Sequence, residues 1–168
     1  MESDAELNWF IYCISVFIST AMHELAHASA AVAYENEVYD VGILLLGVLP
    51  IGAYVCYDAR EDNRKQRFQI ALAGIEMNLS IGGVSLILSC LIPEMEFTYF
   101  MIAALSIAIA VINALPTSGL DGEGALSAIF DVKNCGETAK KCLYNRKIRE
   151  RFMRRGVRGF FLLRIICF

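Results

Sequence analysis

Long apolar stretches alternate with short polar segments along the chain. Three of these stretches, at about 8–34, 68–92 and 97–115, approach or exceed the roughly 20 residues that a helix needs to cross a bilayer. A soluble protein can bury one such helix, but three in a chain of 168 residues are not expected of a soluble domain. The pattern therefore predicts three transmembrane helices.

Segment 38–57 follows a different pattern. It contains Gly42, Gly47, Pro50 and Gly52 among many β-branched and aromatic residues. That composition favours short strands over a spanning helix. Open backbone at membrane depth has to be covered by protein or line a wet cavity. We therefore predict a re-entrant, β-hairpin-like segment, and the alternative is a fourth spanning helix.

Composition and charge support a membrane protein. Hydrophobic residues make up 57% of the chain, which is high for a soluble domain. All fifteen Lys and Arg residues fall in two blocks, 60–67 and 133–164. Basic segments stay on the cytoplasmic side of a membrane, so both blocks are expected there, with the acidic N-terminus outside. A fourth spanning helix would break this topology.

The expected fold class is thus an all-α membrane protein with a three-transmembrane-helix core, the re-entrant segment and a basic cytoplasmic tail. We divide the chain into a core at 1–130 and a tail at 131–168. The last stretch, 156–168, is too short to cross a bilayer and suits an amphipathic helix at the interface.

The first apolar stretch carries His23-Glu24-Leu25-Ala26-His27, an H-E-x-x-H motif. Helical spacing of four places the two histidines on one face, where they can bind one zinc ion. Glu24 can then act as the general base on a zinc-bound water. Ionisable residues inside an apolar span are costly and mark function. The alternative is a polar packing cluster between helices.

Zinc held by two histidines needs a third protein ligand and leaves a fourth position for water. Asp121 is the candidate, because Pro116 and Gly119 break the third helix just before it. At 1.5 Å per residue, His23 and Asn113 lie at a similar depth, about 22 and 24 Å from the outer ends of their helices. We therefore predict one Zn²⁺ per chain held by both histidines and Asp121. The alternative is that Asp121 caps a helix over 122–130.

These motifs together resemble the site-2 protease family of intramembrane zinc metalloproteases. Besides H-E-x-x-H, the resemblance rests on N-x-x-P-x-x-x-L-D-G at 113–122. It extends to LPIGAYV at 49–55 and to A-G-I-E-M-N at 73–78, where Ile75 and Ala53 replace the family's usual proline and glycine. The resemblance implies a minimal form without PDZ or CBS domain, in a bacterial or archaeal plasma membrane.

The resemblance implies peptide hydrolysis, with Glu24 accepting a proton from the attacking water. Asn113 and Asn78 are the candidate amide donors to the oxyanion, and each is equally explained by a hydrogen bond between helices. Glu76 is a candidate partner for a ligand histidine or for a neighbouring helix. The expected partners are a transmembrane protein substrate, the lipid bilayer and a membrane regulator, with no nucleic acid.

Two other functions fit part of the pattern. A membrane protein that binds or transports metal would also bury histidines and a carboxylate, but it would not need Glu24 beside the ligands. A non-catalytic scaffold could keep the motif without activity. Replacing Glu24 with Gln separates an enzyme from both, because the enzyme would keep zinc and lose proteolysis.

Overall fold

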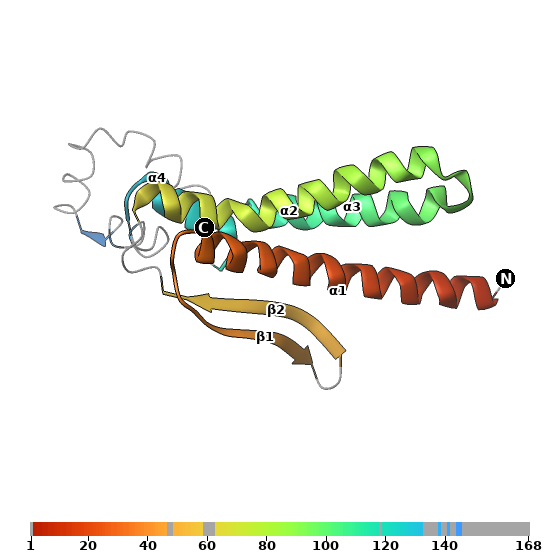
Figure 1. Ribbon diagram of the computed structural model, residues 1–168, viewed down its shortest axis with the longest axis horizontal. Coiled ribbons are helices and arrows are strands. Elements are labelled where there is room, and N and C mark those ends of the chain that lie inside the picture. The colour runs from red at the N-terminus through yellow and green to blue at the C-terminus, as the bar shows by residue number, and fades with distance from the viewer. Residues whose placement is uncertain are drawn as a thin grey trace.

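The computed structural model describes residues 2–46, 49–58, 63–117 and 119–132, together with residues 138, 141, 144 and 145. Its elements in chain order are α1 (Glu2–Ala33), β1 (Val38–Leu46), β2 (Leu49–Tyr57), α2 (Arg64–Leu91), a 3₁₀ helix η1 (Pro93–Met95), α3 (Glu96–Asn113) and α4 (Asp121–Ile129). The three long helices run side by side, with the hairpin next to α1 and α4 at one end of the bundle (Figure 1). Helix α2 contacts α1, α3 and α4 and is therefore the centre of the fold.

The first helix ends in a left-handed residue that turns the chain toward the hairpin. Glu35 has a φ of 64°. The N–H of Glu35 donates to the carbonyl of Val32, and the N–H of Asn36 donates to the carbonyl of Ala31, at 2.9 and 3.1 Å. This pair of bonds satisfies carbonyls that the helix end would otherwise leave unpaired.

Helix α2 begins at a capping box. The side chain of Asn63 accepts hydrogen bonds from the N–H groups of Lys65 and Gln66, and the Gln66 side chain accepts from the N–H of Asn63. The helix ends at Leu91, two residues before Pro93, because a proline cannot continue the hydrogen-bond ladder. The 3₁₀ helix η1 follows, and α3 then returns antiparallel to α2.

The segment 38–57 forms two antiparallel strands, as its composition predicts. The register runs from Val38 opposite Tyr57 to Leu46 opposite Leu49, with irregularities near both ends. β2 packs along α1, whereas β1 lies on the outside of the hairpin and contacts α1 less (Figure 1). The alternative of a fourth helix here is wrong, because these residues pair as strands.

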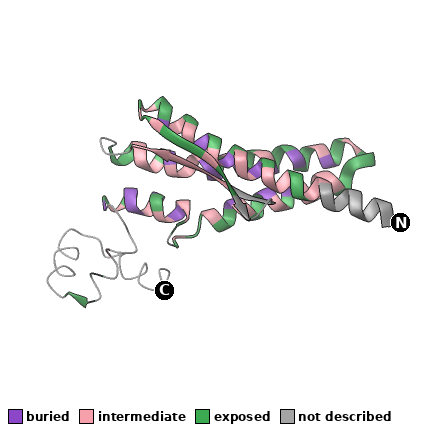
Figure 2. Ribbon diagram, turned by 90° about the horizontal axis from the view of Figure 1, so that it is seen from below, coloured by how far each residue is buried: buried purple, intermediate pink, exposed green. Residues whose placement is uncertain are grey.

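The interior of the helical bundle consists of small side chains. Buried residues recur along the helices at helical spacing (Figure 2). Those in α2 and α3 are Ile70, Gly74, Ile75, Asn78, Gly82, Ser85, Ser89, Ala103, Ser106 and Ala110. Small residues let helix backbones approach closely, which is how helices associate where lipid removes the hydrophobic driving force.

The large apolar side chains lie instead on the outside. Ile18, Ile87, Phe97 and Val111 are each more than half exposed, and many others on the three long helices are exposed as well. Soluble proteins rarely leave apolar surface of this extent uncovered. Two helical segments, Arg64–Leu91 and Pro93–Asn113, are long and apolar enough to cross a membrane. Helix α1 is not one of them, and it carries His23, Glu24 and His27.

The basic tail lies largely outside the described residues. The amphipathic helix expected at 156–168 and most of 133–155 fall there. At the edge of the described chain, the Arg67 guanidinium pairs with the Asp131 carboxylate at 2.7 Å and links the start of α2 to the end of α4.

Candidate metal centre

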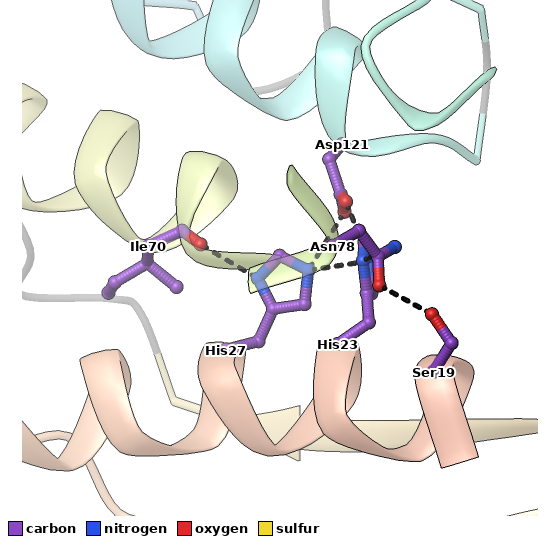
Figure 3. A network of polar contacts seen from close by, with 6 residues as sticks. All are labelled: Ser19, His23, His27, Ile70, Asn78 and Asp121. Carbon is purple, nitrogen blue, oxygen red and sulfur yellow. Dashed lines mark hydrogen bonds and ion pairs between the residues drawn. The ribbon is translucent and has the colours of Figure 1, made fainter. Parts of the chain in front are cut away.

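Ser19, His23 and His27 form a buried stripe on one face of α1. Their exposed fractions are 2%, 4% and 8%. The spacing of four residues stacks them one helical turn apart, as the H-E-x-x-H motif requires. The stripe faces α2, and Figure 3 shows both imidazoles projecting from α1 toward Asp121.

Asp121 reaches the histidines from the first residue of α4. Gly119 turns the chain with a φ of 91°, a conformation that side chains disfavour. Gly122 packs so closely on the carbonyls of Ala114 and Leu115 that a Cβ there would collide with them. The glycines thus bring the start of α4 against the end of α3 and aim the carboxylate at α1.

The alternative of Asp121 as a helix cap is wrong. Helix α4 begins at Asp121 itself, and the preceding residue, Leu120, makes no side-chain capping bond. The carboxylate oxygens lie instead 2.9 Å from Nε2 of His23 and 3.2 Å from Nε2 of His27. Burial opposes ionisation of Asp121, but the contacts with the two imidazoles lower its pKa from 3.8 to about 2. The group is therefore a carboxylate at neutral pH.

The three side chains fit a bound metal ion. One ligand atom from each of His23, His27 and Asp121 lies within 4.8 Å of the others. Oxygen Oδ2 of Asp121 is buried, and no donor is aligned with it in the described structure, although Nε2 of His23 lies 2.9 Å away. Nδ1 of His27 lies 2.7 Å from the carbonyl of Ile70, so a neutral ring has only a lone pair at Nε2. That lone pair faces a carboxylate oxygen, and two facing acceptors favour a cation between them.

Gly74 forms the wall of this centre on α2. A Cβ at this position would lie 2.5 Å from Nε2 of both His23 and His27. The absence of a side chain therefore leaves the two ligand nitrogens accessible. Two imidazoles and one carboxylate make a donor set that zinc takes in catalytic sites.

A hydrogen-bond network supports His23 from the side opposite Asp121. The amide nitrogen of Asn78 lies 2.9 Å from Nδ1 of His23, and the hydroxyl of Ser19 lies 3.1 Å from the amide oxygen. The hydroxyl of Ser106 follows at 3.2 Å from that of Ser19. The network therefore joins α1, α2 and α3 at one buried point, and Figure 3 shows its members from α1 and α2.

Glu24 lies beside the histidines and not among them. Its side chain is half-buried, and the backbone N–H of Val55 in β2 lies near its carboxylate. Thus the hairpin borders the cluster on the Glu24 side, while α2 and α4 border it on the other sides.

Of the other candidate residues, Asn78 contacts the cluster, whereas Asn113 and Glu76 do not contact it in the described structure. Asn113 is the last residue of α3, and within the described chain no hydrogen bond joins its side chain to the cluster. Asn78 contacts a ligand histidine, the role that the sequence suggested for Glu76, whereas Glu76 is exposed on α2. Sequence reasoning missed Ser19 and the Ile70 carbonyl. Ser19 precedes His23 by one helical turn, which is a weak signal, and a backbone carbonyl gives none.

Comparison with known proteins points to one family. A family model described as peptidase family M50 matches residues 10–98, which include the H-E-x-x-H motif and the hairpin but not Asp121. A solved structure of a site-2 protease from Methanocaldococcus jannaschii has a TM-score of 0.59 and 25% identity, over 81% of this chain and 65% of that one.

Two curated proteins of the same archaeon are also similar. A zinc metalloprotease is 28% identical over 128 residues, which are 74% of this chain and 36% of that protein. An uncharacterized protein is 35% identical over 103 residues, which are 60% of this chain and 27% of that protein. The matched part of the chain thus spans about a third of the length of these relatives.

Proposed function

Because the chain belongs to peptidase family M50, the family of the site-2 proteases, we propose that it is a zinc-dependent intramembrane endopeptidase. Its substrates would be peptide bonds in or near transmembrane segments of other membrane proteins. The observation that carries the proposal is the convergence of His23, His27 and Asp121 from two separate elements, with Glu24 beside them.

In this proposal one Zn²⁺ is held by His23, His27 and Asp121. When bound, zinc supplies Lewis-acid polarisation and makes water a nucleophile near neutral pH. The chain's own residues supply the rest of the environment. Asp121 contributes a negative charge to a largely buried site, and the carbonyl of Ile70 holds the His27 ring with its Nε2 toward the centre.

Glu24 is the proposed general base. It is not one of the three ligands, and its carboxylate lies close enough to His23, His27 and Asp121 to interact with their charges. It would accept the proton of the attacking water and pass it to the leaving amine. The N–H of Val55 helps to orient this carboxylate. Asn113 remains the candidate amide donor to the oxyanion, whereas the amide of Asn78 is engaged with His23.

The chemistry is proposed to occur within the membrane. We assign α1, α2 and α3 as three spans of a core at 1–130, with the N-terminus outside and the basic tail at 131–168 in the cytoplasm. The exposed apolar side chains of the bundle support a lipid environment. The plasma membrane of a bacterium or archaeon is the proposed location, and a membrane regulator is a further proposed partner.

The hairpin is the proposed route by which a substrate reaches the site. A substrate helix has to unwind locally to present a peptide bond, and an extended segment can then add to a strand edge. Among the described residues, β1 pairs only with β2, so its outer edge has free backbone groups. The other strand of the hairpin, β2, borders Glu24.

Zinc content and cleavage measured together test the proposed function. The parent and Glu24→Gln proteins are purified in detergent, and bound zinc and cleavage of candidate membrane substrates in liposomes are measured. We expect one zinc per chain in both, with cleavage at least about 100-fold slower in Glu24→Gln because the base is lost. Glu76→Gln is the matched control, because it removes an exposed carboxylate of α2, and it should cleave like the parent.

The outcomes distinguish the alternatives. Zinc in the parent without cleavage of any membrane substrate would favour a metal-binding protein or a scaffold. A parent protein without stoichiometric metal, or a Glu24→Gln protein that cleaves as fast as the parent, would overturn the proposed function.

A further inference from the structure

The two ligand histidines differ in what holds their second nitrogen. Nδ1 of His27 faces the carbonyl oxygen of Ile70, which can only accept a hydrogen bond. Nδ1 of His23 faces the side-chain amide of Asn78, which can donate from its nitrogen or accept at its oxygen. The tautomer of His27 is therefore fixed by the backbone, while that of His23 depends on the orientation of one amide.

The arrangement in the structure gives His23 the tautomer that cannot bind a metal through Nε2. The nitrogen of the Asn78 amide faces Nδ1, so Nδ1 accepts and the single proton of the neutral ring is on Nε2. The nitrogen that carries this proton lies 2.9 Å from Oδ2 of Asp121 and 3.2 Å from Nε2 of His27. The oxygen of the Asn78 amide accepts at the same time from the Ser19 hydroxyl.

We propose that Asn78 is a positioning residue whose amide turns by 180° when His23 binds metal. This inference rests on the proposed metal centre. After the turn, the amide oxygen accepts from Nδ1–H of His23, and Nε2 presents its lone pair to the metal. The ring keeps one proton in both arrangements, and only the nitrogen that carries it changes.

The hydroxyl groups next to Asn78 allow this turn. Once the amide nitrogen faces Ser19, the Ser19 oxygen accepts from it and donates its own proton to Ser106, 3.2 Å away. A hydroxyl can donate and accept, so the chain reverses its direction while the heavy atoms stay in place. The amide oxygen and nitrogen are similar in size, so the turn creates no collision.

Burial makes the network obligatory. Asn78 and Ser106 are fully buried, and Ser19 is 2% exposed. Water is therefore not at hand to replace a lost partner, and an unpaired polar atom in such a place is destabilising. The amide has a partner at each end in both orientations, which aspartate or leucine cannot offer.

Zinc affinity of three variants tests the role of Asn78. Asn78→Leu removes both hydrogen bonds at nearly constant volume, and we expect zinc to bind about 10- to 100-fold more weakly. Asn78→Asp can only accept, so it keeps the ligand tautomer of His23 and should bind within about tenfold of the parent. Ser85→Ala, on the same buried face of α2, is the control and should bind like the parent.

Nitrogen NMR gives a readout that does not depend on activity. The chain has only two histidines, so histidine-selective ¹⁵N labelling yields two rings. In the parent stripped of metal by a chelator, we expect His27 protonated at Nδ1 and His23 at Nε2. Addition of zinc should move the His23 proton to Nδ1. In Asn78→Asp, the His23 proton should be at Nδ1 without zinc.

Each outcome decides between the two proposals. Unchanged zinc affinity in Asn78→Leu, or a His23 ring protonated at Nδ1 in the stripped parent, would overturn the role of Asn78 and leave the protease proposal standing. A parent that binds no zinc at all would overturn both.

Discussion

His23 and His27 are neighbours on one helix, yet the structure supports them in different ways. The His27 support is a backbone carbonyl within α2, which no side-chain substitution removes. The His23 support is the side chain of Asn78, which depends in turn on hydroxyl groups from two other helices. One ligand is thus set by the fold itself, whereas the other depends on three side chains and on how the three helices are rotated.

The largest effect on zinc affinity is expected at Gly74, which lies next to both histidines. Gly74→Ala would place a methyl group 2.5 Å from Nε2 of each ring, so it would affect both ligand histidines equally. We expect zinc affinity to fall more than about 100-fold, because the new carbon would collide with both ligand nitrogens and displace the two rings. Isothermal titration with zinc measures the loss.

Gly83→Ala is the matched control for Gly74→Ala. Gly83 is also in α2, but a Cβ there meets no atom within 4 Å. Alanine favours a helix by up to about 1 kcal/mol over glycine, so this variant should bind zinc like the parent. Equal zinc affinity in both variants would show that Gly74 does not border the ligand nitrogens.

A smaller effect on zinc affinity is expected at Ser106, the member of the hydrogen-bond network furthest from His23. Ser106→Ala removes the hydroxyl that donates to Ser19 in the structure and that would accept from Ser19 once the amide of Asn78 has turned. One hydrogen bond contributes about 1 kcal/mol, which corresponds to about fivefold weaker zinc binding. Ser89→Ala is the control, because the Ser89 hydroxyl bonds only to its own helix, and its zinc affinity should be that of the parent. A Ser106→Ala protein with parental affinity would separate Ser106 from the metal centre.

The smallest effect on zinc is expected near the His27 support. Asn63→Ala removes the N-cap of α2 and should lower the free energy of unfolding by about 1 kcal/mol. The carbonyl of Ile70 lies two turns further along the helix, beyond the region that frays. Zinc affinity should therefore change less than about twofold, while denaturation in mixed micelles registers the loss of stability. A tenfold loss of zinc affinity would mean that the backbone support is as sensitive as the side-chain support.

Sequence reasoning predicted the parts of the fold and site that depend on local spacing. The hairpin at 38–57 follows from a run of β-branched and aromatic residues interrupted by Gly and Pro, and the facing of His23 and His27 follows from their spacing of four. The approach of Asp121 followed from two distant motifs placed at one depth. The helix-cap alternative for Asp121 failed because α4 starts one residue earlier than a cap requires.

The supports of the histidines could not be predicted in the same way. The meeting of Ser19, Asn78 and Ser106 depends on the rotation of three helices about their own axes, which hydropathy does not fix when the core residues are small. Every residue has a backbone carbonyl, so the sequence gives no sign that the carbonyl of Ile70 would contact His27. Asn113 and Asn78 looked equivalent in the sequence, and only the packing of α1 on α2 distinguishes them.

The bundle of small side chains also limits how the protein can diverge. A substitution inside α2 or α3, at positions such as Gly82 or Ala103, adds volume where two backbones already touch and forces the helices apart. A substitution between apolar residues on the outer surface changes no contact inside the bundle. Related sequences should therefore vary mainly at the outer surface of the bundle. The conserved positions of the bundle should be those with the smallest side chains.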